Sequence, residues 1–146
     1  TNMKLWIDTE FTTFKGSLIS MAIIDENDEV FYEVIEFPEA ECHEWVKANV
    51  LPILDQTPIS KEMFEYKFYK YLSKYDEIHL IADWPDDIKY FCEVLHISPG
   101  ECLNIPTRTT MEICRRLDYK SNRPHNALSD VIGIKQAWMK KYEANV

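Results

Sequence analysis

Three segments that lie far apart in the chain carry side chains suited to one site. The run IDTEF places Asp8 and Glu10 at the end of an apolar segment, ADWPDD holds three aspartates, and HNALSD spaces His125 and Asp130 five residues apart. Carboxylates are hard oxygen ligands for divalent cations such as Mg²⁺ and Mn²⁺. Histidine ordinarily titrates near neutral pH, which suits a general base. Together these groups could hold a divalent cation beside a titratable imidazole.

Each segment also has a purely structural interpretation. Asp8 and Glu10 point to the same face of a strand, and they could be solvated where that strand ends. The aspartates of ADWPDD could open a helix. Asn126 followed by Ser129 would serve as a helix N-cap, and Asp130 would complement the helix dipole. A shared site is favoured if the segments meet, because ligands of open α/β sheets collect where strands end and helices begin.

Hydrophobic patterning predicts the strands that must position these groups. Apolar runs bounded by polar or turn residues are typical of buried strands. Four such runs occur, at residues 4–8, 17–24, 29–37 and 77–83. The acidic turn at 25–28 is expected to join the second and third runs as a hairpin. A further short strand is expected near residues 103–105.

Helical spacing of apolar residues predicts the rest of the domain. The predicted helices cover residues 45–50, 64–75, 88–95 and 127–142. Thr109 with Glu112 three residues later forms a capping box, which predicts a short additional helix through Leu117. The order of elements predicts an α/β fold with a mixed central sheet flanked by helices, in which the antiparallel strands come first and parallel strands follow.

Composition limits the possible classes of protein. The 146 residues are 46% hydrophobic and 13% aromatic, enough for one core, so we expect a single domain over residues 3–146, with Thr1 and Asn2 ahead of a natural start at Met3. No membrane-length apolar run or signal-peptide pattern occurs, so we expect a cytoplasmic protein with no membrane partner. The four cysteines lack CxxC spacing and are expected to be reduced thiols. A formal charge of −9 argues against coating of nucleic acid by a broad basic face, so any contact must be local or bridged by cations.

The motifs IDTEF, ADWPDDIKYF and HNALSD, in this order, resemble those of the DEDDh superfamily of 3'-to-5' exonucleases, of the RNase T and oligoribonuclease type. The similarity spans nearly the whole chain, and the compact size with the segment WVKANVLP makes it look most like the small bacterial exoribonuclease group. The resemblance implies an RNase H-like fold and metal-dependent hydrolysis at single-stranded 3' ends, with RNA or short oligoribonucleotides ranked above DNA. It is also compatible with a homodimer, although no stretch identifies an interface.

The resemblance implies a role for each matched residue. Asp8, Glu10 and Asp130 would form the core of a site for two divalent cations, Mg²⁺ or Mn²⁺, and Asp87 would complete it partly through water. Such a pair of cations activates the attacking water and stabilises the leaving oxygen of a phosphodiester. His125 would take a proton from the attacking water.

The middle motif leaves a choice between neighbouring aspartates. The family has an aspartate followed by apolar residues one and four positions later, which matches Asp87 with Ile88 and Phe91 better than it matches Asp86. Asp83 stands where the family has a polar amide. It would either act as an additional group outside the direct ligands or indicate that the motif has shifted.

Substrate contacts are expected close to the first and third motifs. Thr9 and Phe11, with Phe14 nearby, could contact the terminal nucleotides, with the phenylalanines stacking on bases; core packing is the alternative for the two rings. Arg123 is expected to contact substrate. The basic stretch 115–123, which also contains Arg115, Arg116 and Lys120, could guide a phosphate backbone or be a solvated helix end.

Other functions remain as alternatives. An endonuclease on the same architecture is disfavoured by the HxAxxD spacing, which belongs to the exonuclease branch. A non-catalytic protein that keeps the fold to bind nucleic acid or a partner is disfavoured because packed carboxylates lower stability when no cation is needed. A DNA-specific exonuclease is the third alternative, since nothing in the chain identifies the sugar.

Overall fold

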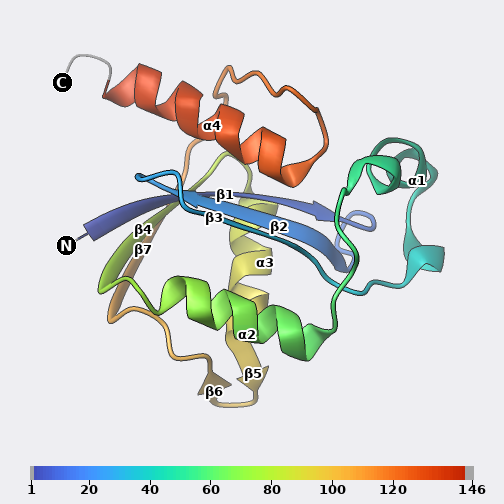
Figure 1. Cartoon of the computed structure of the whole chain (residues 1–146), viewed down its shortest axis with the longest axis horizontal. Coiled ribbons are helices and arrows are strands. Elements are labelled where there is room, and N and C mark those ends of the chain that lie inside the picture. The colour runs from blue at the N-terminus through green and yellow to red at the C-terminus, as the bar shows by residue number, and fades with distance from the viewer. Residues whose placement is uncertain (1, 144–146) are drawn as a thin grey trace.

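The computed structural model describes residues 2–143, in which helices cover both faces of a five-stranded sheet (Figure 1). In chain order the elements are β1 (Asn2–Phe11), β2 (Leu18–Asp25), β3 (Val30–Val34), the 3-10 helix η1 (Glu39–Glu41), α1 (Glu44–Asn49), the 3-10 helix η2 (Leu51–Ile53), α2 (Lys61–Leu72), β4 (Glu77–Ala82), α3 (Pro85–Leu95), β5 (His96–Ser98), β6 (Glu101–Cys102), β7 (Arg108–Ile113) and α4 (Ala127–Tyr142). The strand order is β3-β2-β1-β4-β7, and β5 pairs with β6 in a separate hairpin.

Both kinds of strand pairing occur in the sheet. β1 pairs with β2, and β2 with β3, in antiparallel orientation. β1 with β4, and β4 with β7, are parallel. The predicted mixed sheet flanked by helices is therefore confirmed, with the antiparallel strands first in the chain.

No helix among residues 2–143 has the length and apolar composition needed to cross a bilayer. The four cysteines are free thiols, as predicted.

The helix predicted from Thr109 and Glu112 is wrong, because residues 108–113 form the edge strand β7. Thr109 pairs with Ile78 and Glu112 with Ile81 in the parallel ladder to β4. Pairing with β4 satisfies backbone groups that a helix would otherwise bond internally, and the β-branched residues suit a strand. Glu112 accepts a hydrogen bond from Trp138 Nε1 at 2.9 Å instead of capping a helix.

The short strand predicted near residues 103–105 is also wrong. The described strands on either side are β6, which ends at Cys102, and β7, which begins at Arg108. Leu103 and Ile105 pack against the core cluster beneath α2 and α3. Their apolar character therefore reflects burial against that cluster. Buried strands and loops packed on a core both contain such apolar residues, so the pattern does not distinguish them.

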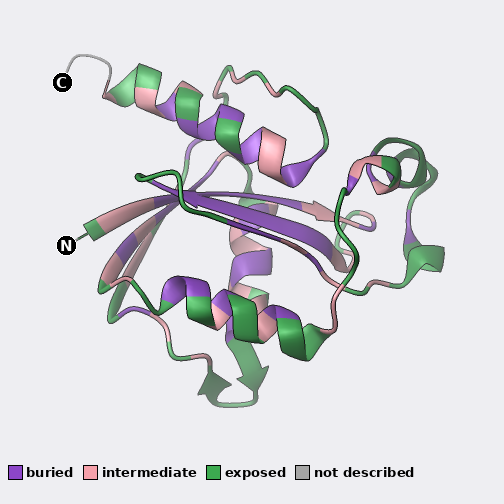
Figure 2. Cartoon of the chain, in the orientation of Figure 1, coloured by how far each residue is buried: buried purple, intermediate pink, exposed green. Residues whose placement is uncertain are grey.

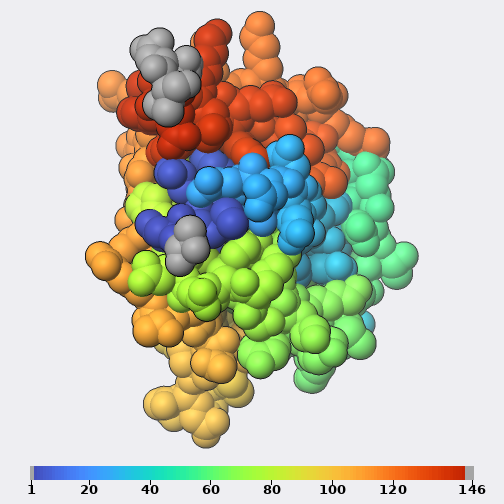
Figure 3. Space-filling model, turned by 60° about the vertical axis from the view of Figure 1, so that its left-hand side comes forward, coloured from blue at the N-terminus to red at the C-terminus, as the bar shows by residue number. Residues whose placement is uncertain are grey.

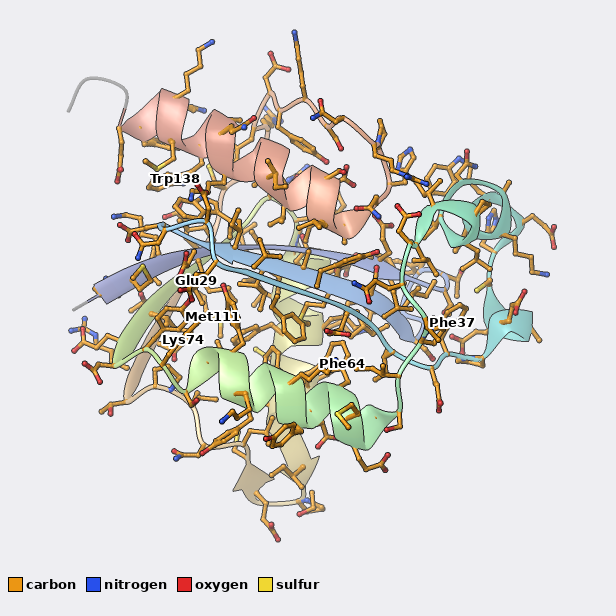
Figure 4. The ribbon with its side chains drawn as sticks, in the orientation of Figure 1. Glu29, Phe37, Phe64, Lys74, Met111 and Trp138 are labelled. Carbon is orange, nitrogen blue, oxygen red and sulfur yellow. The ribbon has the colours of Figure 1, made fainter. Side chains whose placement is uncertain are left out.

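Side chains of β1 alternate between two hydrophobic cores, one on each face of the sheet. Figure 2 shows that buried residues gather in the central strands of this sheet. Trp6 lies in the core beneath α4 and meets Trp138 edge to face, with ring centroids 5.6 Å apart. Leu5 and Ile7 lie in the core formed with α2 and α3, which includes Phe64. Trp138 and Phe64 approach the sheet from opposite sides (Figure 4). By the same alternation Asp8 and Glu10 continue on the α4 face, and Thr9 faces the α3 side.

The start of α4 is fixed over the end of β1 by its cap. Asn126 is the N-cap, as predicted, and its side-chain oxygen accepts a hydrogen bond from the Ser129 N–H at 3.0 Å. Its amide nitrogen donates to the Ile53 carbonyl at 2.9 Å and to the Tyr32 hydroxyl at 3.3 Å. Because the cap residue is buried and bonded to β3 and η2, the first turn of α4 is held in one position relative to the sheet.

The segment between β7 and α4 packs closely along α4 at Gly133. A Cβ atom added at this glycine would lie 2.2 Å from the Lys120 carbonyl oxygen and 3.2 Å from Tyr119 Cδ2. The backbone at Lys120 therefore passes closer to α4 than a side chain at position 133 would allow. This contact places Tyr119, and the chain that leads to the N-cap, against the helix.

Replacement of Gly133 by alanine is expected to destabilise the protein. Alanine normally favours a helix interior over glycine by about 1 kcal/mol, but here the added methyl group would meet backbone. We expect the free energy of unfolding to fall by about 1–3 kcal/mol, measured by urea denaturation. Gln136→Ala on the exposed side of the same helix is the control and should change stability by less than about 0.5 kcal/mol. A Gly133→Ala variant as stable as the parent would contradict this close packing.

Candidate metal centre

The acidic residues and the histidine predicted from three separate segments line one pocket of about 250 Å³. Its lining residues are Asp8, Thr9, Glu10, Phe11, Asp83, Trp84, Asp87, Tyr119, His125 and Asp130. Of the residues predicted for the site or its substrate contacts, Arg123 and Phe14 lie outside this lining. Arg123 instead forms an ion pair with Asp55, with an N–O distance of 2.9 Å.

The sheet topology explains why these segments meet. β1 and β4 are parallel and Ile7 pairs with Ala82, so Asp83 directly follows β4 beside Asp8. Pro85 then opens α3, and Asp87 lies in its first turn. Asp130 lies in the first turn of α4 on the other face of the sheet. The pocket is therefore built at the carboxyl ends of two parallel strands, where two helices begin.

The carboxylates form two groups that share Asp8. Ligand oxygens of Asp8, Glu10 and Asp130 lie within 4.8 Å of one another, and so do those of Asp8, Asp83 and Asp87. A set of three oxygen ligands at such spacing can hold a divalent cation. Two such sets around one shared carboxylate suit a pair of cations.

Two buried oxygens in this cluster test whether a cation fits. Among the described residues, neither Asp8 Oδ2 nor Asp87 Oδ2 has a hydrogen-bond partner. Buried acceptors without a partner are unfavourable, and a carboxylate is among the most unfavourable of them. A hard cation between the two groups would satisfy both atoms, so the residues present fit divalent metal binding.

Burial and mutual repulsion raise the pKa values of these carboxyl groups. Burial, and then repulsion from Asp130 and Asp87, raise the pKa of Glu10 to about 9. The pKa of Asp8 is raised by burial first and then by Asp87 and Glu10. Burial likewise raises the pKa values of Asp83, Asp87 and Asp130. Without a cation the cluster therefore favours bound protons, and a cation would displace them.

Thr9 holds Asp87 in place. Its backbone N–H donates to Asp87 Oδ1 at 3.0 Å, and its hydroxyl donates to the same oxygen at 2.5 Å. The predicted substrate contact of Thr9 therefore competes with this interaction, since the buried hydroxyl already has a partner. Asp86, by contrast, accepts a hydrogen bond from Trp84 Nε1 at 3.0 Å and does not line the pocket. Of the three aspartates of ADWPDD, the structure brings Asp87 and Asp83 into the pocket.

His125 lies at the exposed side of the cluster, immediately before the cap of α4. Its backbone N–H donates to Asp130 Oδ2 at 3.2 Å, and its ring meets Trp45 edge to face with centroids 4.7 Å apart. Its φ of 75° is in the left-handed region, which is uncommon for a non-glycine residue. Conformations of this kind are found disproportionately at functional sites.

Aromatic side chains border the acidic pocket. Phe11 stacks on Tyr90 at 5.1 Å and is half-buried, which fits the core-packing alternative. Phe14 is 75% exposed, so core packing does not account for its ring. A second pocket, of about 330 Å³, shares Glu10 and Phe11 with the first and is also lined by Thr13, Phe14, His43, Trp45 and Val46. The shared residues make the two pockets neighbours.

Sequence reasoning missed three aromatic residues at this site, namely Trp45, Trp84 and Tyr119. Trp84 directly follows Asp83, so its position beside the middle motif was the only available signal. Burial, followed by repulsion from Asp8 and Asp130, raises the pKa of the Tyr119 hydroxyl.

The fold and the pocket thus define an α/β protein with a buried carboxylate cluster suited to divalent cations. No protein-family model matches the chain, and no curated protein sequence matches it significantly.

The stability of the metal-free protein is expected to fall as pH rises. The pKa of Glu10 is raised from 4.5 to about 9, so its stabilising contribution is fully present below about pH 4.5 and is lost as pH rises through about 9. Asp8 and Asp87 shift in the same direction. Thermal melts with chelator should therefore show a falling Tm between about pH 5 and pH 9.

Added Mn²⁺ should reverse this trend. Mn²⁺ competes with protons for the same oxygens, so it should raise Tm more at about pH 8 than at about pH 5. Asp8→Asn removes the carboxylate shared by the two groups, and it should weaken both the pH dependence and the response to Mn²⁺. A Tm that responds neither to pH nor to Mn²⁺ would be inconsistent with a buried metal-binding cluster.

Proposed function

We propose that the protein is a metal-dependent 3'-to-5' exonuclease that hydrolyses phosphodiester bonds at the 3' ends of single-stranded nucleic acid, with RNA or short oligoribonucleotides favoured over DNA. The observation that carries the proposal is the pair of carboxylate groups sharing Asp8 in one pocket with His125. The order of the three motifs supports it. The strand order, in which β2 alone runs against the other four strands, agrees with the RNase H-like fold that the resemblance implies.

The carboxylates would hold two divalent cations, Mg²⁺ or Mn²⁺. Asp8, Glu10 and Asp130 form one ligand set, and Asp83 and Asp87 form the other with Asp8. Bound there, the cations would activate the attacking water and stabilise the leaving oxygen. Thr9 is a positioning residue in this scheme, because its two hydrogen bonds to Asp87 Oδ1 leave Oδ2 available as a ligand.

His125 would act as the general base. It lines the same pocket as the five carboxylates, and its side chain is exposed, so it can take a proton from the attacking water and release it to solvent. The contact with Trp45 limits the orientations of the ring. The hydrogen bond from its own backbone to Asp130 keeps the imidazole beside the carboxylates.

The neighbouring aromatic pocket would receive the terminal nucleotide. It adjoins the carboxylates through Glu10, and the exposed rings of Phe14 and Trp45 offer faces on which a base can stack. Stacking on aromatic side chains tolerates any base and requires that the base is not already paired. This pocket supports a preference for single-stranded ends.

The reaction is tested with matched 5'-labelled single-stranded RNA and DNA oligonucleotides in Mg²⁺, Mn²⁺ or chelator, resolved at single-nucleotide steps. We expect a metal-dependent ladder that shortens from the 3' end, with RNA degraded faster. Asp8→Asn and Asp87→Asn should lose this activity, whereas the neighbouring Asp86→Asn should keep it. Cleavage of DNA alone would favour a DNA-specific enzyme, and absence of cleavage with every metal would favour a non-catalytic binding protein.

His125→Ala should separate catalysis from metal binding. We expect kcat to fall by about 10²–10⁴-fold, the usual contribution of a general base, while the Mn²⁺-induced rise in Tm stays near that of the parent. His96→Ala, in the exposed β5 strand, is the matched control and should retain activity. Unchanged turnover of His125→Ala would remove this residue from the mechanism.

A further inference from the structure

The segment between β7 and α4 runs along α4 in the opposite direction to the helix (Figure 1). Near its start, Arg116, Leu117 and Asp118 form a groove with the last turns of the helix, where Ala137, Lys140 and Lys141 lie. Asp118 is the one acidic residue in this groove lining, beside three basic ones. The segment then passes Gly133 at Lys120, and it ends at His125 in the acidic pocket. At 1.5 Å per residue, this path along the helix is about 20 Å long.

Basic side chains without acidic partners follow this path. They are Arg115, Arg116, Lys120, Lys140 and Lys141, here called the basic strip. Among residues 2–143, none of the five forms an ion pair. In Figure 3 the segment and α4, in orange and red, form one end of the molecule.

Most lysines elsewhere are already neutralised by carboxylates. Within the part of the chain that the structure describes, seven of them form ion pairs, namely Lys4, Lys47, Lys61, Lys67, Lys74, Lys89 and Lys135. In a chain with 25 acidic and 16 basic residues, unpaired cations concentrated along one helix form a local positive surface on an otherwise negative molecule. Such a surface attracts polyanions and accelerates their association.

We propose that the basic strip binds the phosphates of the nucleic-acid strand on the 5' side of the scissile bond. The inference rests on the proposed exonuclease function, because that function places the 3' end of the strand at His125. The remaining strand must leave the pocket along the surface of a protein whose formal net charge is −9. Two members of the strip show that it connects the pocket with the far end of α4. The Arg115 guanidinium lies 4.8 Å from the ring centre of Trp84, which lines the pocket. The next residue, Arg116, lies in the groove with Lys140 and Lys141.

The strip would recognise charge without reading sequence. Lysine and arginine contacts to phosphate fix the position of a strand and carry no base specificity. A dinucleotide would occupy the acidic and aromatic pockets without reaching the far end of the strip. A longer strand would gain contacts with it, so the strip would favour longer substrates through KM and leave the bond-breaking step unchanged.

The test compares two variants with the same loss of charge. One carries Arg116→Gln, Lys140→Gln and Lys141→Gln in the strip. The control carries Lys61→Gln, Lys67→Gln and Lys70→Gln on α2, on the opposite side of the sheet, where the surface ion pairs that are removed contribute little. KM and kcat are measured in Mn²⁺ on a ribodinucleotide and on an RNA of about 16 nucleotides, and binding of the longer RNA is measured in chelator at several salt concentrations.

The strip variant should raise KM for the longer RNA by about tenfold and reduce the slope of log affinity against log salt by about 2, at about 0.7 per phosphate contact. Its kinetics on the dinucleotide and all values for the control should match the parent. Equal behaviour of the two variants would overturn the proposal. So would competition by polyglutamate of matched charge as effective as that by RNA, which would indicate an acidic protein partner.

Failure of the strip and failure of the proposed function give different results. In one outcome, the parent and both variants all fail to hydrolyse RNA while only the strip variant loses salt-dependent RNA binding. That result would support the binding role of the basic strip and contradict the exonuclease function. If all proteins hydrolyse both RNAs with the same KM and the same salt dependence, the exonuclease stands and the strip does not.

Discussion

The repulsion among carboxylates at the end of β1 is the constraint on which this arrangement depends. Asp8 is buried at the centre of both acidic groups, and burial with repulsion raises its pKa. Negative charges at such spacing are unfavourable in a site with little water unless protons or cations neutralise them. The surrounding fold keeps them together through the first turns of α3 and α4 and the pairing of β1 with β4. A cation would therefore complete a site that the fold has already assembled.

The central strand connects the stability of the fold with the geometry of the site. The alternation that places Trp6 under α4 and Ile7 against α3 continues into Asp8, Thr9 and Glu10. Core packing thus fixes the direction in which each site residue points, because a slip of one residue would exchange the two faces. Thr9 illustrates the result, since it faces α3 and holds Asp87 from that side.

Charge is distributed so that the unpaired basic residues follow a path along α4 that ends at the acidic cluster. A phosphodiester is repelled by free carboxylates and attracted once cations occupy them. The aromatic pocket beside Glu10 and the basic residues along α4 offer separate contacts for bases and for phosphates. Affinity for a strand would then come from several weak contacts, none of which reads a sequence.

The sequence by itself determined the elements whose patterns are local. The apolar runs of β1, β2 and β4, the helix from Ala127 to Tyr142 with its Asn126 cap, and the acidic motifs at the ends of these elements could all be predicted. These features depend on side-chain alternation, helical spacing and capping, which neighbouring residues specify.

Only the tertiary structure decided the features that depend on distant partners. β7 forms because residues 108–113 pair with β4, which overrides a capping box in the same residues. The motif pattern favours Asp87 over Asp86, but the hydrogen bonds that hold Asp87 in the pocket come from Thr9, which is far away in the sequence. Strand pairing brings Asp83 into the cluster, and the packing at Gly133 brings Tyr119 to the site. Trp45 borders the site through its edge-to-face contact with His125. Local patterns carry no information about such long-range contacts. The free energy of these contacts exceeds the weak local preferences for helix or strand that the patterns record.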